Sequence, residues 1–120
     1  MKKILFIDDV TSNHTLVTRF LLKDGYEVIC CDSAKQSCQL LLDHQFHLVI
    51  TDYGLPDENG IQIAQKLKND LRTKSIPIIL LTAGTFDIEE RMRHETFTDF
   101  ILRKPIDFPL LRKTIRQLIL

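Results

Sequence analysis

Five polar side chains that could share one reaction come directly after predicted β-strands. They are Asp8, Asp9, Asp52, Thr82 and Lys104. Carboxylates, a hydroxyl and an ammonium group are what phosphoryl transfer requires, because the reaction needs a nucleophile, metal ligands and a cation against the phosphoryl oxygens. Whether these five residues act together depends on the fold that carries them.

Five apolar runs rich in β-branched residues predict the strands of one sheet. They cover residues 4–7, 26–31, 48–51, 78–81 and 100–102. A segment with helical spacing of apolar residues follows each run, so strand and helix alternate five times. This alternation predicts an α/β fold in which a parallel sheet has helices on both faces, joined by right-handed crossovers. The fourth run is the most apolar, and we expect it at the centre of the sheet.

The carboxyl ends of parallel strands lie at one edge of a sheet, where open α/β sheets bind their ligands. We therefore expect the five side chains to converge there. Three carboxylates in one place repel each other, and a divalent cation would relieve that repulsion. Oxygen ligands of this kind suit Mg²⁺, while Lys104 supplies a positive charge and Thr82 a hydroxyl donor for a phosphoryl group.

Length and composition predict one ordinary domain over residues 1–120. Sixteen basic residues balance sixteen acidic ones, and no Lys/Arg-rich run argues for direct binding of nucleic acid. The apolar run near the N-terminus is too short for a signal peptide or a membrane span, so we expect a cytoplasmic protein. The three cysteines, an odd count without a C-x-x-C motif, are expected to be reduced.

Over essentially its full length, the chain resembles the receiver domain of bacterial two-component response regulators. The motifs that carry the resemblance are Phe6-Ile7-Asp8-Asp9, Ile50-Thr51-Asp52 with Leu55-Pro56-Asp57 and Gly60, Leu81-Thr82-Ala83, and Lys104-Pro105. Each motif alone is common, but all four occur in order and on the expected elements. The resemblance implies a flavodoxin-like (βα)5 fold with strand order 2-1-3-4-5.

The resemblance also implies a phosphoacceptor and a metal site. Asp52 would take a phosphoryl group from the phosphohistidine of a histidine kinase or phosphotransfer protein and become an aspartyl phosphate. Asp9, Asp52 and the backbone carbonyl of Gly54 would ligate Mg²⁺, and Asp8 would assist through water.

Thr82 and Lys104 would bind the phosphoryl group, and the peptide bond between Lys104 and Pro105 is expected to be cis. Phosphorylation would switch binding to a downstream effector or output domain. The fourth helix, fifth strand and fifth helix would form a face used for partners or for a phosphorylation-dependent dimer.

Two positions depart from the usual receiver pattern. The family carries an aromatic residue three positions before the lysine, but here that position is Ile101, with Phe100 one position earlier. Either the strand register slips locally or the coupling between Thr82 and an aromatic residue is altered. The usual glycine before the fifth strand is also missing, since residues 95–98 read Glu-Thr-Phe-Thr.

Gly54 and Gly84, each two residues after a predicted site residue, place no side chain at the mouth of the site. We therefore expect easy access of water and a short-lived aspartyl phosphate. The predicted fourth helix, roughly residues 87–95, has few apolar residues, and we expect it to pack loosely.

The histidines could suggest a metal site, since His44 and His47 are close in sequence. No third ligand is near them, so we expect surface histidines. His14 and His94 lie in charged helical segments and are also expected to face solvent. Asp57 and Asn59 are expected to be turn residues rather than ligands.

Two other functions compete with a phosphorylated receiver. A haloacid-dehalogenase-type phosphohydrolase also uses an Asp, a Thr and a Lys, but it needs Asp-x-Asp on its first strand, where this chain has Asp8 and Asp9 adjacent. A receiver-shaped interaction module that works without phosphate is the other alternative. We expect a switch rather than an enzyme, either as a stand-alone receiver or as a domain of a larger regulator or hybrid kinase.

Overall fold

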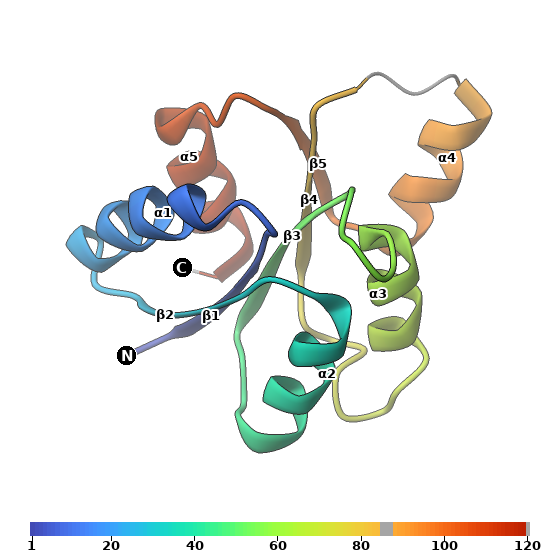
Figure 1. Ribbon diagram of the computed structural model, residues 1–120, viewed down its shortest axis with the longest axis horizontal. Coiled ribbons are helices and arrows are strands. Elements are labelled where there is room, and N and C mark those ends of the chain that lie inside the picture. The colour runs from blue at the N-terminus through green and yellow to red at the C-terminus, as the bar shows by residue number, and fades with distance from the viewer. Residues whose placement is uncertain (85–87, 120) are drawn as a thin grey trace.

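The computed structural model describes residues 1–84 and 88–119 of the chain. Strands and helices alternate along these residues (Figure 1). The strands are β1 (Lys3–Ile7), β2 (Glu27–Cys31), β3 (Leu48–Asp52), β4 (Ile78–Thr82) and β5 (Phe100–Arg103). The helices are α1 (Thr11–Lys23), α2 (Ala34–Asp43), α3 (Gly60–Lys68), α4 (Ile88–Phe97) and α5 (Phe108–Ile119).

The strands form one parallel sheet in the order β2-β1-β3-β4-β5, as the resemblance implied. This is the flavodoxin-like arrangement. The expectation that the most apolar strand lies at the centre was wrong, because β3 holds that place and β4 lies beside it. Both strands are buried along their whole length, so apolar content could not distinguish them.

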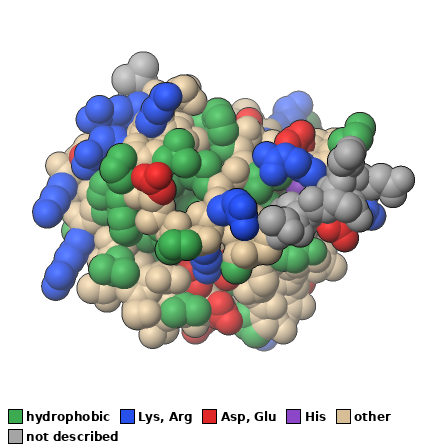
Figure 2. All heavy atoms as spheres, turned by 90° about the horizontal axis from the view of Figure 1, so that it is seen from above, with side chains coloured by type: hydrophobic (Ala, Val, Ile, Leu, Met, Phe, Trp, Pro, Cys, Tyr) green, Lys and Arg blue, Asp and Glu red, His purple; other side chains and the backbone are tan. Residues whose placement is uncertain are grey.

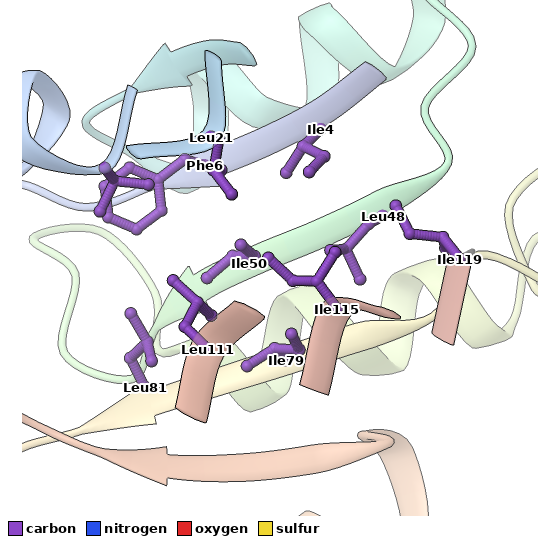
Figure 3. Packing of buried hydrophobic residues seen from close by; sticks show 11 residues of the cluster. Ile4, Phe6, Leu21, Leu48, Ile50, Ile79, Leu81, Leu111, Ile115 and Ile119 are labelled. Carbon is purple, nitrogen blue, oxygen red and sulfur yellow. The ribbon is translucent and has the colours of Figure 1, made fainter. Parts of the chain in front are cut away.

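Two apolar layers hold the helices on the sheet. On one face, α1 and α5 pack on β1, β3 and β4, and Figure 3 shows how Leu111, Ile115 and Ile119 of α5 lie against the strands. On the other face, α2 and α3 contribute buried residues that include Ala34 and Ile63. Figure 1 shows α4 on the same side as α2 and α3. The edge formed by the carboxyl ends of the strands, where the predicted site residues stand, lies between these two layers.

Helix α4 spans residues 88–97, two residues further than expected at its C-terminal end. Part of the expected start, Asp87, lies outside the described residues. The turn into β5 needs no glycine, because the Thr98 hydroxyl donates to the carbonyl oxygen of His94 and no non-glycine residue among those described has a positive φ.

The described cysteines are all free, as expected. Cys31 is buried, and its burial raises the pKa of its thiol to about 12, so it remains a protonated apolar group. No helix in the described part of the chain is long and apolar enough to span a bilayer.

Candidate functional site

The carboxylate of Asp52 lies at the carboxyl end of the central strand, as the sequence predicts. Only 8% of the residue is exposed. Its neighbour Tyr53 donates its backbone N–H to the carbonyl oxygen of Leu81 at 2.8 Å, which fixes the backbone just beyond the strand. Asp52 is therefore rigidly held, and its carboxylate faces the edge where β1, β4 and β5 also end.

Three carboxylates converge at this edge. One oxygen from each of Asp8, Asp9 and Asp52 lies within 4.8 Å of the others. No other group of three possible Cys, His or carboxylate ligands occurs among residues 1–84 and 88–119. Asp9 is exposed and the other two are buried, so the cluster is open on one side. Mg²⁺ binds oxygen ligands of this kind, and the donor set fits it.

Lys104 supplies the positive charge in the cluster. Its Nζ atom lies 3.1 Å from Oδ2 of Asp8 and 3.2 Å from Oδ2 of Asp52. One ammonium against three carboxylates leaves an excess of negative charge, which favours a divalent cation. The peptide bond between Lys104 and Pro105 is cis, which confirms the expectation.

Burial and the charge of the partner have opposite effects on the pKa values of Asp52 and Lys104. Burial raises the pKa of Asp52 and outweighs the nearby charge of Lys104, which lowers it. Burial also lowers the pKa of Lys104, but its hydrogen bond to Asp8 and the charge of Asp52 raise it, and the net pKa is raised. Lys104 therefore stays charged, while burial opposes the charged form of Asp52.

The carboxylate of Asp8 has three hydrogen-bond donors around it within the protein. The carboxylate of Asp8 accepts from the backbone N–H of Val10 at 2.9 Å, from the side-chain amide of Asn13 at 3.0 Å and from Lys104. These bonds occupy much of its acceptor capacity. Neither Val10 nor Asn13 was among the predicted site residues, because a backbone N–H and a side-chain amide in a turn carry no local pattern that marks them as donors.

His14 supports the same turn between β1 and α1. Its Nε2 atom donates to the backbone carbonyl oxygen of Asp8 at 2.6 Å, and its ring lies edge-on to Phe6 with centroids 5.9 Å apart. His14 is half-buried rather than on the surface as expected.

Thr82 and Gly54 lie beside the carboxylates. Thr82 ends β4 and is 3% exposed, and its carbonyl oxygen accepts from the backbone N–H of Lys104 at 2.8 Å. Its hydroxyl oxygen accepts from the N–H of Gly84 at 3.2 Å. A Cβ atom added at Gly54 or Gly84 would meet no atom within 4 Å, so the mouth of the site is open at both glycines.

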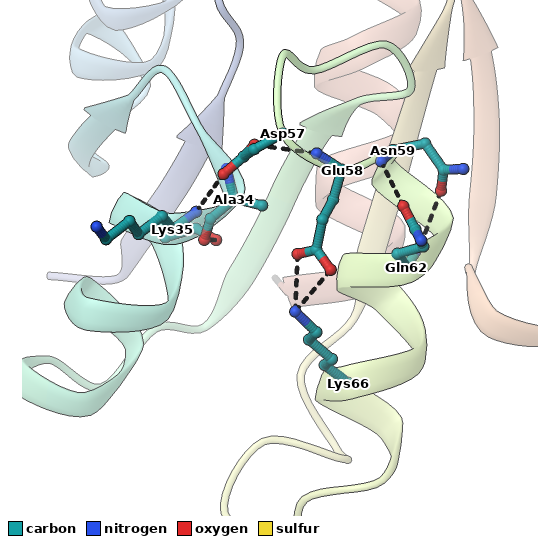
Figure 4. A network of polar contacts seen from close by, with 8 residues as sticks. Ala34, Lys35, Asp57, Glu58, Asn59, Gln62 and Lys66 are labelled. Carbon is teal, nitrogen blue, oxygen red and sulfur yellow. Dashed lines mark hydrogen bonds and ion pairs between the residues drawn. The ribbon is translucent and has the colours of Figure 1, made fainter.

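The loop between β3 and α3 is tied to its surroundings by polar contacts (Figure 4). Asn59 caps α3 and shares a capping box with Gln62. Asp57, expected to be only a turn residue, accepts from the backbone N–H groups of Ala34 and Lys35 at the start of α2. This contact joins segments that are distant in the sequence, so local patterns could not predict it.

The register of β5 resolves the alternatives at Ile101. The pairing with β4 is continuous, and Ile101 lies opposite Leu80. Leu102 packs on the α5 side of the sheet, so by alternation Ile101 faces the side of α4 and Phe100 does not. The register does not slip, and an aliphatic residue occupies the position three residues before Lys104.

The expectation that His94 faces solvent was wrong. His94 is 6% exposed, and its ring lies 5.3 Å from the ring of Tyr53, the residue after Asp52. Burial lowers the pKa of His94, so its neutral form is favoured. Helix α4 thus packs on the site loop through an imidazole, which a search for apolar stripes misses.

His44 and His47 both contact Lys3 on β1. The ring nitrogen Nδ1 of His47 accepts from the backbone N–H of Lys3 at 3.0 Å, and Nδ1 of His44 lies 3.2 Å from its Nζ atom. The two residues therefore have local partners at the far end of the sheet.

Charge is unevenly distributed on the surface. Figure 2 shows Lys and Arg side chains gathered on the side of the molecule where Figure 1 places α1 and α5. Arg112, Lys113 and Arg116 of α5 line a shallow groove there. The fold thus gathers basic residues although the chain has no net charge.

Comparison with known proteins gives a consistent result. Residues 4–116 match the family model described as the response regulator receiver domain. The chain is 30% identical over 104 residues to the two-component response regulator ORR3 of Oryza sativa, a match that covers 86% of this chain and 79% of ORR3. It is 27% identical to the polar-differentiation response regulator DivK of Brucella ovis, over 97% of this chain and 94% of DivK.

Solved structures agree with this fold. The chemotaxis protein CheY4 of Vibrio cholerae superposes with a TM-score of 0.91 at 25% identity, over 99% of both chains. The response regulator TrrA of Thermotoga maritima, determined in complex with Mg²⁺ and BeF, superposes with a TM-score of 0.87 at 25% identity, over 99% of this chain and all of TrrA. The chain belongs to the family of response regulator receiver domains of two-component signalling.

Proposed function

We propose that Asp52 is the phosphoacceptor of this receiver domain. The observation that carries the proposal is the position of its carboxylate, 3.2 Å from the ammonium of Lys104 and within 4.8 Å of two further carboxylates. A nucleophilic oxygen, a cation for the phosphoryl oxygens and a set of metal ligands are thus in reach of one phosphorus atom.

The proposed metal site consists of Asp9, Asp52 and the backbone carbonyl of Gly54. Asp8 acts indirectly, because its carboxylate already accepts from Val10, Asn13 and Lys104. Bound Mg²⁺ neutralises charge on the phosphoryl oxygens. The complex of TrrA with Mg²⁺ and BeF supports this choice of metal by similarity.

In the proposed transfer, an oxygen of Asp52 attacks the phosphorus of a phosphohistidine on a histidine kinase or phosphotransfer protein. A P–O bond forms as the P–N bond breaks, and the histidine leaves. Lys104 pairs with a phosphoryl oxygen. Thr82 turns its hydroxyl from Gly84 to donate to another, which shifts the loop after β4 and α4.

This switch would control binding to a downstream effector or output domain. The proposed surface is formed by α4, β5 and α5, which also suits a phosphorylation-dependent dimer. Lys113 and Arg116, which line a groove on α5, support an acidic partner for the α5 part of this surface, while the neighbouring Arg112 already pairs with Asp24. We place the protein in the cytoplasm, where histidine kinases transfer their phosphoryl groups to receiver domains.

A direct test is phosphorylation of the purified chain with acetyl phosphate and Mg²⁺. We expect one phosphoryl group per chain by mass spectrometry. No labelling should occur when Mg²⁺ is chelated before the reaction, or in Asp52→Asn. Labelling that persists in Asp52→Asn would refute the proposal. Multiple turnover of a small phosphate ester would instead favour the phosphohydrolase.

A further inference from the structure

Three backbone N–H groups at the start of α2 have side-chain acceptors, and two of these acceptors belong to a residue from another part of the chain. The first four N–H groups of a helix have no partner within the helix. In α2, the N–H of Gln36 donates to the hydroxyl of the N-cap residue Ser33, and the N–H of Ser37 makes the first regular helical bond, to the Ser33 carbonyl. The N–H groups of Ala34 and Lys35 donate to the two carboxylate oxygens of Asp57, each at 3.0 Å.

Asp57 is well suited to this position. Its carboxylate also accepts from the N–H of Glu58 at 3.1 Å. The hydrogen bonds from Ala34 and Lys35 hold the pKa of Asp57 below its ordinary value, and a negative charge is favourable at the start of a helix. Figure 4 shows Asp57 reaching from its loop to α2.

The same loop carries Gly54, the proposed carbonyl ligand of Mg²⁺. Gly54 forms an antiparallel bridge with Asn59, and Gly60 donates its N–H to the carbonyl oxygen of Tyr53 at 2.8 Å. A Cβ atom at Gly60 would lie 2.6 Å from the backbone oxygen of Asp52, so the loop closes tightly on the phosphoacceptor strand. The base of the loop is held by β3 and its tip is held by α2.

We propose that Asp57 is a positioning residue for the metal site, because it ties the tip of the Gly54 loop to the start of α2. The proposal rests on the proposed function of this edge of the sheet as a Mg²⁺ site. The metal then selects the loop position in which the Asp57 bonds are made. By linkage, Mg²⁺ must stabilise those bonds by as much as the bonds favour Mg²⁺ binding.

The first experiment compares Mg²⁺ affinity of Asp57→Asn and Glu58→Gln, followed by the backbone amide shifts of Asp9 and Gly54. Both variants lose one negative charge from the same loop, but the carboxylate of Glu58 pairs with Lys66 of α3 rather than with the start of α2. We expect Asp57→Asn to weaken Mg²⁺ binding by about tenfold, the lower end for groups that orient metal ligands. Glu58→Gln should change it by less than about twofold.

A second experiment needs no variant. We expect saturating Mg²⁺ to slow amide hydrogen exchange of Ala34 and Lys35 in the wild-type chain. The amide of Leu110 is the control, because it also donates to an aspartate at a helix start, Asp107 just before α5, outside the metal loop. Its exchange should not respond to Mg²⁺.

The role of Asp57 would be refuted if the two variants bound Mg²⁺ with equal affinity, or if Mg²⁺ did not change the amide exchange of Ala34 and Lys35. Neither result would refute the metal site itself. A wild-type chain that binds no Mg²⁺ would overturn both. The exchange experiment decides the matter even if Asp57→Asn does not fold.

Discussion

The Nζ atom of Lys104 lies 3.2 Å from Oδ2 of Asp52, although the two residues stand at the ends of β5 and β3 and the strand β4 lies between them. The side chain of Lys104 therefore reaches past the end of β4 to the carboxylate. This one contact brings the cation to the proposed nucleophile.

Removal of the charge at Asp52 should stabilise the fold at neutral pH. Burial raises the pKa of Asp52 above its ordinary 3.8, so the folded state pays for the ionised carboxylate wherever the pH exceeds that raised pKa. We expect Asp52→Asn to have a higher free energy of unfolding at pH 7. The gain should shrink as the pH falls through the raised pKa, because wild-type Asp52 then becomes neutral. Urea unfolding of both proteins at pH 7 and at acid pH measures this difference. A less stable Asp52→Asn at pH 7 would contradict the prediction.

Removal of Lys104 should have the opposite effect. Asp8 is fully buried, and Lys104→Ala deletes one of its three donors and its counter-ion. We expect a loss of about 1–3 kcal/mol in the free energy of unfolding. Mg²⁺ should restore more stability to this variant than to the wild type. Lys113→Ala, an exposed lysine on α5, serves as the control and should stay within about 0.5 kcal/mol of wild type.

Larger side chains at the mouth of the site should lengthen the life of the aspartyl phosphate. Gly54 and Gly84 leave open space, and neither has a positive φ, so Leu at both positions can be accommodated. We expect exclusion of water to slow hydrolysis about tenfold, which corresponds to about 1.4 kcal/mol. The half-life of phosphorylated protein after removal of acetyl phosphate is the measurement. A half-life no longer than that of wild type would remove the steric explanation.

Acid should weaken the packing of α4 through His94. Burial lowers the pKa of His94, with Glu90 opposing the shift and Arg93 adding to it. The unfolded chain takes up a proton near the ordinary 6.5, before the folded chain does, so the free energy of unfolding should fall as the pH drops below that value. The part of this loss that disappears in His94→Gln is due to His94. A loss of equal size in His94→Gln would show that other groups cause it.

The sequence was sufficient for the fold and for the five polar residues of the site. Parallel strands end at one edge, so Asp8, Asp52 and Lys104 could be expected to meet from their positions after apolar runs alone. Apolar content alone could not identify the central strand, since β3 and β4 are equally buried, and only the strand order implied by the resemblance did so.

The contacts that the sequence did not reveal are tertiary ones. Asp57 reads as a turn residue until the start of α2 is known to lie beside it. His94 reads as a surface residue because its helix has no clear apolar stripe, whereas in the fold its ring packs against the ring of Tyr53. Such contacts depend on how distant segments pack, which local spacing does not encode.

The most direct test of the central claim is a titration of the ¹⁵N-labelled chain with beryllofluoride in the presence of Mg²⁺. Binding at Asp52 predicts that the amides of Asp9, Tyr53, Thr82 and Lys104 shift together and saturate at one equivalent, only when Mg²⁺ is present and not in Asp52→Asn. Shifts that occur without Mg²⁺, or that persist in Asp52→Asn, would contradict the assignment of Asp52 as the phosphoacceptor.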